Sequence, residues 1–222
     1  MIDVAAISFT ESTSWLLSRH YAKRLPSISF AFGAFQDRRL IGVVTYGTPS
    51  SAPLRSGICG PEMSDRVLEL NRLCCANDRN TASRLVGRSL RLLPTPSIVV
   101  NYADTAQGHV GYVYQATNFI YTGLSAKRTD WKIRGSEHLH GATVADESRG
   151  QAHRVEWMRE KYGEAFYLLD RPRKHRYVYF TGTAKQRKEM LAVLRYSVEP
   201  YPKGETARYD ATASVESQDR LF

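Results

Sequence analysis

The amino-acid sequence predicts an α/β protein in which a mixed central sheet is flanked by helices. Short apolar runs of strand length alternate with segments of helical periodicity, which is the layer order of an α/β fold. The run "SIVVNYA" at residues 97–103 is apolar on both faces, as expected for a central strand covered by helices on each side. A chain of 222 residues with 42% hydrophobic content can bury a sizeable core without disulfides. We therefore expect one domain over residues 1–203, followed by a polar, flexible tail over residues 204–222.

The first part of the chain is expected to form a helix, a hairpin and a long loop. Residues 12–20 have helical periodicity, and strands at residues 27–35 and 38–47 are joined by a polar turn. The segment "TPSSAPLRSGICGPEMS", residues 48–64, is expected to be a loop because it is rich in Pro, Gly and Ser. A further strand is expected at residues 66–75.

Capping residues predict the boundaries of the helices that follow. Asn80 can cap a helix over residues 81–93, which Pro94 and Pro96 end. Thr183 and Gln186 have the spacing of a capping box. The remaining elements expected are a strand at 97–103, a helix at 108–117, strands at 119–122 and 127–133, a helix that Asp146 starts and Gly163 ends, strands at 165–170 and 175–180, and the capped helix at 184–195.

The charge balance indicates an anionic partner. The formal net charge is +9 and the sequence pI is about 9.6. The basic C-terminal extension includes residues 171–188, which hold seven Lys or Arg, no acidic residue, and aromatic side chains between the basic ones. Such a surface attracts nucleic acid through neutralisation of phosphates, and the same pattern also fits a solvated cationic face.

Cysteine usage and the N-terminal segment indicate a cytoplasmic protein. The three cysteines, Cys59, Cys74 and Cys75, form no even framework and no C-x-x-C motif, so we expect reduced thiols. The N-terminus has no basic segment before an apolar stretch, which argues against secretion. No run approaches the roughly eighteen apolar residues of a membrane span, so no membrane contact is expected.

A row of arginines lies on one face of the helix expected at residues 81–93. Arg84, Arg88 and Arg91 follow helical spacing, whereas another face is apolar and holds Leu85, Leu92 and Leu93. Near a helix N-terminus, Arg84 and Arg88 would suit a phosphate-bearing cofactor. A solvated cationic face explains the same spacing.

The segment "GHVGYVYQATNFIYTG" is similar to a pattern of the GCN5-related N-acetyltransferase (GNAT) superfamily: a short helix with a tyrosine, then an Asn/Gly-Phe pair, then a strand. Here these residues are Tyr114, Asn118, Phe119 and Gly123. The resemblance implies a GNAT-like sheet that splays between "RVLELNRLCC" and "SIVVNYA", with an acyl donor in the gap and the tyrosine as acid for the leaving group. The superfamily's glycine-rich pyrophosphate loop is missing from "CCANDRNTASRLVG", which weakens the case for coenzyme A as the donor.

Several segments together resemble the Mom DNA-modification proteins of Mu-like phages. They are "RHYAKRLP", "LELNRL", "LVGRSLRLL", "YADTAQGHVGYVYQATNFIYTG" and "KHRYVYFTG", which span roughly residues 15–203 in the family's order. The resemblance implies an enzyme that converts adenine in double-stranded DNA to a form with a carbamoylmethyl group on the exocyclic nitrogen, which blocks host restriction. It also implies a set of catalytic residues, namely His20, Tyr21, Arg72, Ser89, Asp104 and Tyr114. The residues alone favour a packed helix end for His20 and Tyr21, and it is the resemblance that favours a catalytic role.

The chemistry of adenine explains why an acid would stand at the end of an apolar strand. The exocyclic amine is conjugated and weakly basic, so its attack on a carbonyl needs a base, and a carboxylate desolvated by apolar neighbours is a stronger base. Asp104 fits that role, although a turn or helix cap explains the same position. Tyr114 could donate a proton to the leaving group, and Arg72 could hold a phosphate or the developing oxyanion.

The product suggests a route through glycine. A carbamoylmethyl group is an isomer of a glycyl group, so acyl transfer of glycine followed by attack of its free amine on the ring carbon would yield it. An aminoacyl-tRNA or a glycyl thioester would then be the donor, and acyl-CoA stays open as another. The alternative activity is a generic acyltransferase acting on a metabolite or protein amine, which predicts tight acyl-CoA binding and indifference to DNA.

The target atom of an adenine is hidden inside a duplex, so the enzyme must extrude the base or act on a distorted helix. Tyr21, Tyr46, Tyr102 and Trp131 are candidate stacking faces, and Arg173, Lys174 and Arg176 would follow the DNA backbone. A homodimer would suit a DNA enzyme, but no heptad or apolar patch in the sequence indicates one. No metal site is assigned: iron would need two His and a carboxylate, and His20, His138, His140 and His153 lack strong ligand spacing.

Overall fold

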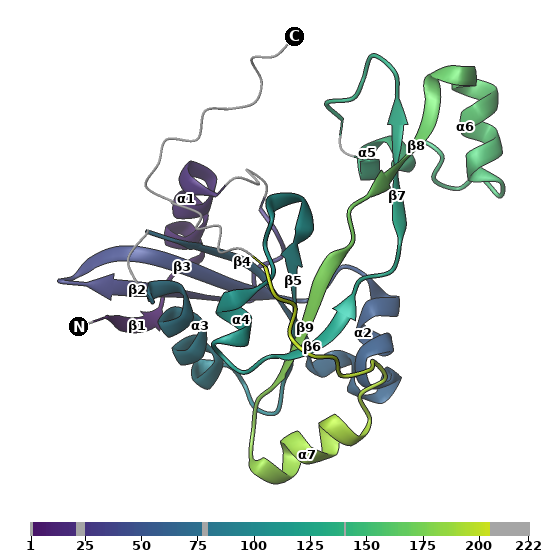
Figure 1. The fold of residues 1–222 in the computed structure, drawn as a ribbon. Helices are drawn as coiled ribbons and strands as arrows, with labels where there is room; N and C mark the ends of the chain where they lie inside the picture. Colours follow the sequence, from purple (N-terminus) through teal and green to yellow (C-terminus); the bar gives the residue numbers. More distant parts are fainter. Residues whose placement is uncertain (1, 21–24, 77–79, 140, 205–222) are drawn as a thin grey trace. The chain divides into compact units, whose positions relative to one another are not determined.

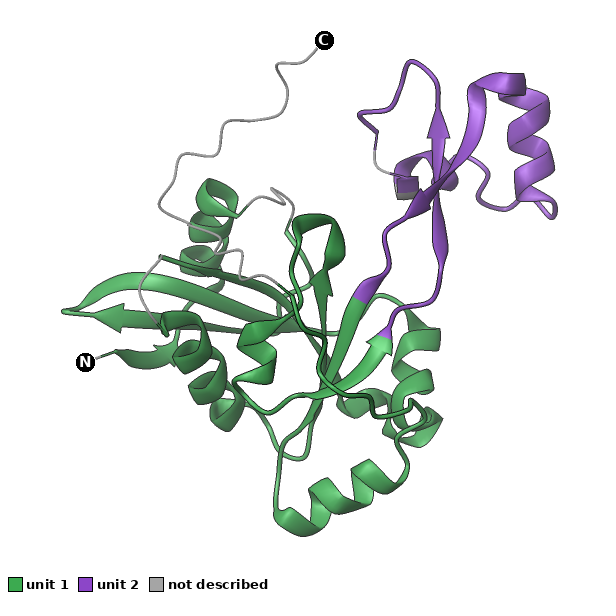
Figure 2. Ribbon diagram, in the orientation of Figure 1, with its two compact units in different colours: residues 1–123, 175–222 green, residues 124–174 purple. Residues whose placement is uncertain are grey.

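The computed structural model describes residues 2–20, 25–76, 80–139 and 141–204. These residues form two compact units (Figure 2). Unit 1 holds the residues up to Gly123 and those from His175, and unit 2 holds Leu124–Lys174. Unit 2 is therefore an insertion between two consecutive parts of unit 1.

Among the described residues, unit 1 is built on a seven-stranded sheet with the strand order β1-β2-β3-β4-β5-β9-β6 (Figure 1). Its strands are β1 (Asp3–Ala6), β2 (Phe30–Gln36), β3 (Arg39–Gly47), β4 (Val67–Cys75), β5 (Ile98–Asp104), β6 (Ile120–Leu124) and β9 (Lys174–Phe180). Neighbouring strands from β1 to β4 are antiparallel, whereas β4 and β5 are parallel. The mixed central sheet that the sequence predicts is confirmed.

Helices cover both faces of this sheet. Those of unit 1 are α1 (Phe9–Arg19), α2 (Ala52–Cys59), α3 (Thr81–Leu92), α4 (Tyr112–Gln115) and α7 (Ala184–Ala192). Figure 1 shows α1 and α3 on opposite sides of strands β2 and β3. We call the side covered by α3 and α4 the α3 face, and the side covered by α1, α2 and α7 the α1 face.

The α3 face buries the largest core of unit 1. Val44 of β3 and the β5 residues Val99 and Ala103 join Leu85 of α3 in one buried cluster, with Val113 of α4 packed against it. Full burial of one such Val or Leu side chain contributes about 1.5–3 kcal/mol. Because side chains alternate along a regular strand, the residues in this core identify which face their strand neighbours occupy, except where a bulge interrupts the strand.

The α1 face holds two smaller cores. On β5, Ile98 and Val100 pack with Ile58 of α2 and Met190 of α7. Further along the sheet, the buried residues Leu16, Val43 and Cys74 form the second cluster under α1. Because Val43 and Val44 are consecutive, β3 separates these cores as a strand apolar on both faces must.

Helix α2 lies within the segment that was expected to be a loop, so that expectation is wrong. The Ser51 hydroxyl accepts a hydrogen bond from the Leu54 N–H at 3.3 Å, and Pro53 stands in the first turn, where its missing N–H is not needed. Gly60, with φ of 97°, follows the last helical residue. Ser, Pro and Gly are loop formers in composition, but here they stand at the ends of a helix.

The helix expected at residues 108–117 is shorter than predicted, and the backbone conformation of two glycines explains why. Gly108 and Gly111 have φ of 66° and 83°, which lie in the left-handed region. A right-handed helix can begin only after Gly111, and Asn118, with φ of 61°, follows it. The preceding turn is a short 3-10 helix, Thr105–Gln107.

The capping predictions have mixed outcomes. The Thr183 and Gln186 capping box is present at the start of α7, and Asn80 precedes α3 without a side-chain cap hydrogen bond. Asp146 does not start a helix; it ends α5 (Gly141–Asp146), and α6 (Arg154–Tyr162) begins after a loop and is followed by Gly163. The edge strand β1 was not anticipated, because four residues carry too little periodicity.

Unit 2 has a core of its own. Strands β7 (Arg128–Ile133) and β8 (Phe166–Arg171) pair antiparallel, and α5 and α6 pack on them. Its hydrophobic core contains the buried residues Ile133, Val144, Met158 and Phe166. No helix among the described residues is both long and apolar enough to cross a membrane.

Candidate active site where β4 and β5 separate

The central parallel strands pair over only a short length. Val67, Leu68 and Glu69 of β4 face Ile98, Val99 and Val100 of β5, and the paired register ends there. Both strands continue past this point, β4 to Cys75 and β5 to Asp104. The splayed pair that the sequence predicts is therefore confirmed. Backbone groups on the facing edges beyond Glu69 and Val100 have no ladder partner in the other strand.

A bulge lies in β4 just after the separation. Thr45 of β3 pairs with Arg72 while Tyr46 pairs with Leu70, so Asn71 is the extra residue. The Asn71 carboxamide holds the bulge in place: its Oδ1 accepts from the Thr45 hydroxyl at 2.7 Å, and its Nδ2 donates to the Ser27 carbonyl at 2.7 Å.

The bulge decides where Arg72 points. Leu70, before it, packs in the α3-face core, whereas Cys74, after it, packs in the core under α1. Regular alternation would have put both on the same side. Arg72 is two residues before Cys74 on the same side of the bulge, so its side chain projects on the α1 face as that of Cys74 does. The Arg72 Nη1 donates a hydrogen bond to the Asn71 carbonyl at 2.7 Å.

Asp104 is the last residue of β5 and caps the turn that follows. Its Oδ1 accepts a hydrogen bond from the Ala106 N–H at 3.1 Å, so the capping role is confirmed. The side chain is half-buried. Tyr102, two residues earlier, packs with the α1-face core, and alternation places Asp104 on that same face.

Tyr114 lies on α4 and belongs to the α3 face. Its ring contacts Phe119 and Tyr177, with centroid distances of 5.5 Å and 5.6 Å. Tyr177 is itself fully buried, and this burial raises the pKa of Tyr177 to about 12. Gly111 allows this packing, because a Cβ there would lie 2.6 Å from the Tyr177 ring.

Ser89 of α3 and Tyr46 of β3 form a buried polar pair on the α3 face. Both side chains are fully buried, and the two hydroxyl oxygens are 2.7 Å apart. Ser89 also donates to the Val86 carbonyl at 3.0 Å, which leaves Tyr46 as the donor of the shared bond. Burial raises the pKa of Tyr46 well above its usual range, so its hydroxyl keeps its proton.

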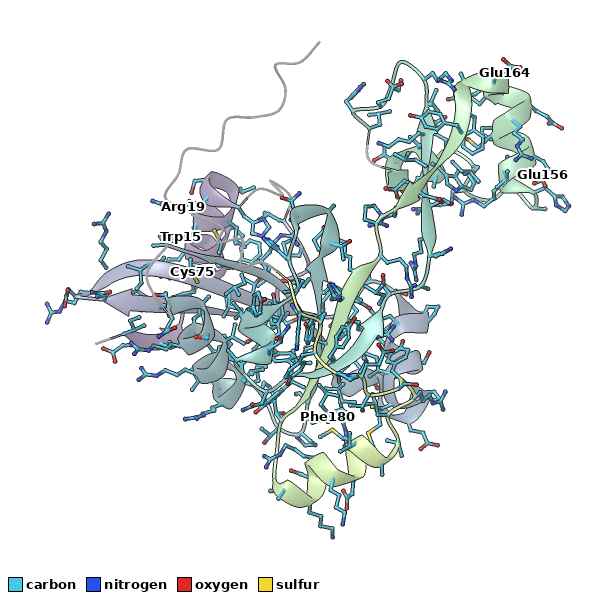
Figure 3. All side chains as sticks on the ribbon, in the orientation of Figure 1. Trp15, Arg19, Cys75, Glu156, Glu164 and Phe180 are labelled. Atoms are coloured by element: carbon cyan, nitrogen blue, oxygen red, sulfur yellow. The ribbon has the colours of Figure 1, made fainter. Side chains whose placement is uncertain are left out.

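His20 stands immediately after α1 and is only 6% exposed. The helix is fixed to β4 by Trp15, whose indole N–H donates to the Cys74 carbonyl at 3.1 Å, and Arg19 lies 4.4 Å from the Trp15 ring (Figure 3). His20 therefore belongs to the α1 face. Tyr21 lies outside the described residues.

The residues assigned to the reaction centre thus divide between the two faces. Ser89 and Tyr114 lie on the α3 face, and His20, Arg72 and Asp104 lie on the α1 face. The separation of β4 and β5 is the place where the sheet between the two faces opens.

The arginine row on α3 is exposed along its length. Arg88 has an internal use: its guanidinium donates to the Ile2 carbonyl and lies 3.8 Å from the Asp3 carboxylate. Arg84 is the arginine nearest the start of α3, and Arg91 lies in its last turn. Leu92, which was expected on an apolar face, is exposed.

The basic residues proposed to follow DNA differ in their surroundings. Arg176 is half-buried in unit 1, where it donates to the Thr122 hydroxyl and carbonyl at 2.9 Å and 2.8 Å and lies 3.4 Å from the Tyr196 ring. Arg173, in unit 2, is exposed and donates to the Ser125 carbonyl at 2.6 Å. The backbone N–H of Lys174 donates to the Ser125 hydroxyl.

Trp131, proposed as a stacking face, lies in β7 of unit 2. Its ring contacts Phe166 edge to face at 5.3 Å, and the Arg154 guanidinium lies 5.3 Å from it. The described part of the chain contains no group of three or more His, Cys, Asp or Glu placed to hold a metal ion. His140 lies outside that part.

Asn71 and Asn101 were not singled out for the site by the sequence, and Tyr46 was expected only as a stacking face. A polar side chain inside an apolar strand pattern could have identified Asn101, because "IVVNYA" contains no other amide. The amino-acid sequence gives no sign of the bulge at Asn71, because the bulge depends on how β3 pairs with β4.

Solved structures of acetyltransferases are distantly similar to this chain. A GNAT-family acetyltransferase from Bacillus cereus is 13% identical, with a TM-score of 0.43 over 82% of this chain and 99% of that chain. A Bacillus subtilis acetyltransferase in complex with CoA is 12% identical, with a TM-score of 0.43 over 82% and 98%. The ribosomal-protein-S18-alanine N-acetyltransferase of Escherichia coli is 6% identical, with a TM-score of 0.44 over 83% and 96%. Likeness this distant says nothing about the reaction.

Similarity in sequence is more informative. The methylcarbamoylase mom of Escherichia phage Mu is 28% identical over 209 residues, which cover 91% of this chain and 84% of that protein. A family model described as the Mom protein family matches residues 1–203. This chain therefore belongs to the Mom protein family.

Proposed function

We propose that this protein converts adenine in double-stranded DNA to its carbamoylmethyl form and so protects phage DNA from restriction in the host cytoplasm. The observation that carries the proposal is family membership over residues 1–203, together with a relative named methylcarbamoylase. The enzyme is acyltransferase-like in its chemistry. The open junction of β4 and β5 supports this, because polar groups from both faces of the sheet flank it.

Asp104 acts as the base in this proposal. The exocyclic amine of adenine must lose a proton as it attacks an acyl carbon, and proton removal by a positioned carboxylate typically contributes 10²–10⁴-fold, an order-of-magnitude range. Asp104 is held at the end of β5 by the hydrogen bond that its Oδ1 accepts from the Ala106 N–H, which fixes the position of the carboxylate. His20 and Arg72 lie on the same face and would orient the base and hold the oxyanion or a phosphate.

Tyr114 acts as the acid for the leaving group. The Tyr114 ring packs against Phe119 and Tyr177, which fixes it on the α3 face. Asp104 lies on the opposite face, the α1 face. An acid and a base on opposite sides of an open strand junction can serve the two reactants of one transfer at the same time. Ser89 supports this side through its bond to Tyr46.

A glycyl donor accounts for the product with an ordinary acyl transfer. The adenine amine attacks the glycyl carbonyl, Asp104 takes the proton, and the donor's tRNA hydroxyl or thiol leaves with a proton from Tyr114. The free glycyl amine then attacks the ring carbon that bears the new amide, and the original carbon–nitrogen bond breaks. The glycine nitrogen becomes the exocyclic nitrogen, and the original nitrogen becomes the terminal carboxamide, so no atom is gained or lost in the second step.

The partner in this proposal is double-stranded DNA with the target adenine extruded. The proposed contacts with the DNA backbone are Arg173, Lys174 and Arg176, and Trp131 is the proposed stacking residue. Such contacts would give an affinity that falls with salt. Arg84 and Arg88 stay the proposed contacts for a phosphate-bearing donor.

The decisive experiment is mass spectrometry of nucleosides from plasmid DNA of bacteria that express the protein. We expect a carbamoylmethyl adenine with the wild-type chain, none with Asp104→Asn, and an undiminished amount with the matched control Asp37→Asn. Asp37 lies in the exposed β2–β3 turn with φ of 49°, a conformation that Asn adopts readily. Absence of any new adenine with the wild-type chain would contradict the proposal.

Glycine labelled with ¹⁵N tests the route. We expect the label on the nitrogen bonded to the purine ring and not in the terminal carboxamide. A modified adenine without label would exclude glycine while leaving the adenine modification itself intact.

A further inference from the structure

Asn101 of β5 carries a buried polar atom without a partner. The residue is 1% exposed, and its Oδ1 makes no hydrogen bond in the part of the chain that the structure describes. An unmade hydrogen bond of a buried group is unfavourable, and native proteins rarely keep one without a use. An apolar side chain of similar size would avoid this cost, so a strand that needed only packing would not hold an amide here.

Asn101 occupies a special position in the sheet. It is the first residue of β5 after Val100, where the pairing with β4 ends. Val99 and Ala103, its neighbours in the alternation, both pack in the α3-face core. The carboxamide therefore projects on the α3 face at the point where the strands separate.

The surroundings of Asn101 are apolar and aromatic. The same core contains the Tyr46 ring, whose hydroxyl already donates to Ser89, and Tyr114 is packed against it. Two hydroxyls of this face are therefore neutral groups: Tyr46 keeps its proton, and Ser89 is a neutral alcohol. A buried acceptor among neutral groups suits a slender ligand that is neutral or singly charged and carries N–H donors. A DNA duplex is too wide to reach a side chain that is buried to this extent.

The division of the site between two faces decides which reactant reaches Asn101. The base must contact the adenine amine, and Asp104 lies on the α1 face. The acid must contact the leaving group, and Tyr114 lies on the α3 face. Because the leaving group belongs to the donor, the α3 face receives the donor.

We propose that Asn101 binds the acyl donor by accepting a hydrogen bond from an N–H group close to the transferred carbonyl. The proposal rests on the proposed function and adds to it a residue that positions the donor. Two donors offer this chemistry: the α-amine of an aminoacyl ester, and the amide N–H of a pantetheine thioester. The bond would set the acyl carbon between Tyr114 on one side and the attacking amine on the other.

Asn101→Leu is the informative substitution, because it keeps the size of the side chain and removes its polar atoms. We expect it to raise Tm by about 2–4 °C, since an unpartnered buried group is replaced by an apolar one. We expect the modified fraction of plasmid adenine to fall tenfold or more at equal protein level, about the loss for one hydrogen bond to a buried group. Stability and activity would thus change in opposite directions.

Val99→Ala is the matched control on the same strand and face. It leaves a cavity in the core, so it should lower Tm while the modified fraction of adenine stays near wild type, provided the protein is folded. If Asn101→Leu lowers Tm as Val99→Ala does and leaves modification unchanged, Asn101 is a packing residue and the inference is wrong. If the wild-type chain makes no modified adenine, the proposed function fails instead, and the two failures are distinguishable.

The donor is distinguished with purified protein and a fixed, saturating DNA. Glycyl-tRNA and glycyl-coenzyme A are each varied as the donor, and the KM of the one that supports transfer is compared between wild type and Asn101→Leu. We expect the KM for that donor to rise tenfold or more, with the KM for DNA unchanged. A rise in the KM for DNA alone would place Asn101 on the adenine and overturn the assignment.

Discussion

The two faces of the central sheet differ in the polar groups that they bring to the junction of β4 and β5. The α3 face holds neutral, buried groups, namely Tyr46, Ser89 and Asn101. The α1 face holds ionisable groups, namely His20, Arg72 and Asp104, of which Asp104 is half-buried. Neutral buried groups suit a small donor that leaves water behind, whereas charged groups suit a polyanion and a proton transfer.

The place of Arg72 in this division depends on a single irregularity in β4. Without the bulge at Asn71, the alternation that puts Leu70 on the α3 face would put Arg72 there too, in an apolar core. A buried guanidinium without a carboxylate partner is strongly unfavourable. The extra residue moves the charge to the other face, and β4 resumes its apolar alternation beyond it.

The largest effect is expected on the α1 face. Asp104→Asn keeps the shape of the side chain and removes its basicity, so kcat for adenine modification should fall about 10²–10⁴-fold. The KM for the donor should stay the same, because the proposed donor site lies on the other face. Steady-state kinetics with DNA and donor varied in turn measures both; a residual rate within tenfold of wild type would remove Asp104 as the base.

The next effect tests whether Ser89 acts by packing on the α3 face. Ser89→Ala leaves the Tyr46 hydroxyl buried without a partner and should lower the free energy of unfolding by about 1–3 kcal/mol. Tyr46→Phe added to Ser89→Ala should recover part of that loss, because both polar groups are then absent. Urea titrations of the two single variants and the double variant give the coupling. Activity that returns with the recovered stability would assign Ser89 a structural role.

A smaller effect is expected from pH through His175. Its Nδ1 lies 2.9 Å from the Tyr121 hydroxyl, and burial lowers the pKa of His175 below the usual 6.5. The unfolded chain therefore binds this proton more readily than the folded protein does. The stabilisation is fully present above about pH 6.5 and is lost as the pH falls through the lower folded pKa. Tm measured from pH 7.5 to 5 should fall less steeply for His175→Gln than for wild type, and equal slopes would contradict the assignment.

The smallest effect concerns the thiols, which lie on both faces. Burial raises the pKa of Cys59 and Cys74 to about 11 and that of Cys75 to about 12. A thiol in this state is a poor nucleophile at neutral pH. We expect negligible alkylation by iodoacetamide in native buffer and full alkylation in denaturant, as measured by intact mass. Rapid labelling of the native protein would show that the cores open more readily than their burial indicates.

Sequence patterns were most successful where a local cause is sufficient. The capping box at Thr183 and the two-sided apolar strand β5 follow from nearby residues, and both are present. The loop expected around Ser51 is a helix, because composition does not say whether Ser, Pro and Gly lie inside an element or at its ends. Helix α4 is short because glycines with positive φ precede it. Helix propensity does not predict the backbone angle that an individual glycine adopts.

The family, the mixed sheet and the identity of the polar residues were determined by the sequence itself, since ordered motifs and periodicity are properties of the chain. The assignment of those residues to faces was decided only by the tertiary structure. Arg72 and Leu70 are two positions apart and lie on opposite sides because of how β3 pairs with β4, and Asn101 is the first residue of β5 beyond its pairing with β4. Strand pairing joins residues that are far apart in the sequence and depends on the whole packed core. No local pattern could therefore have predicted it.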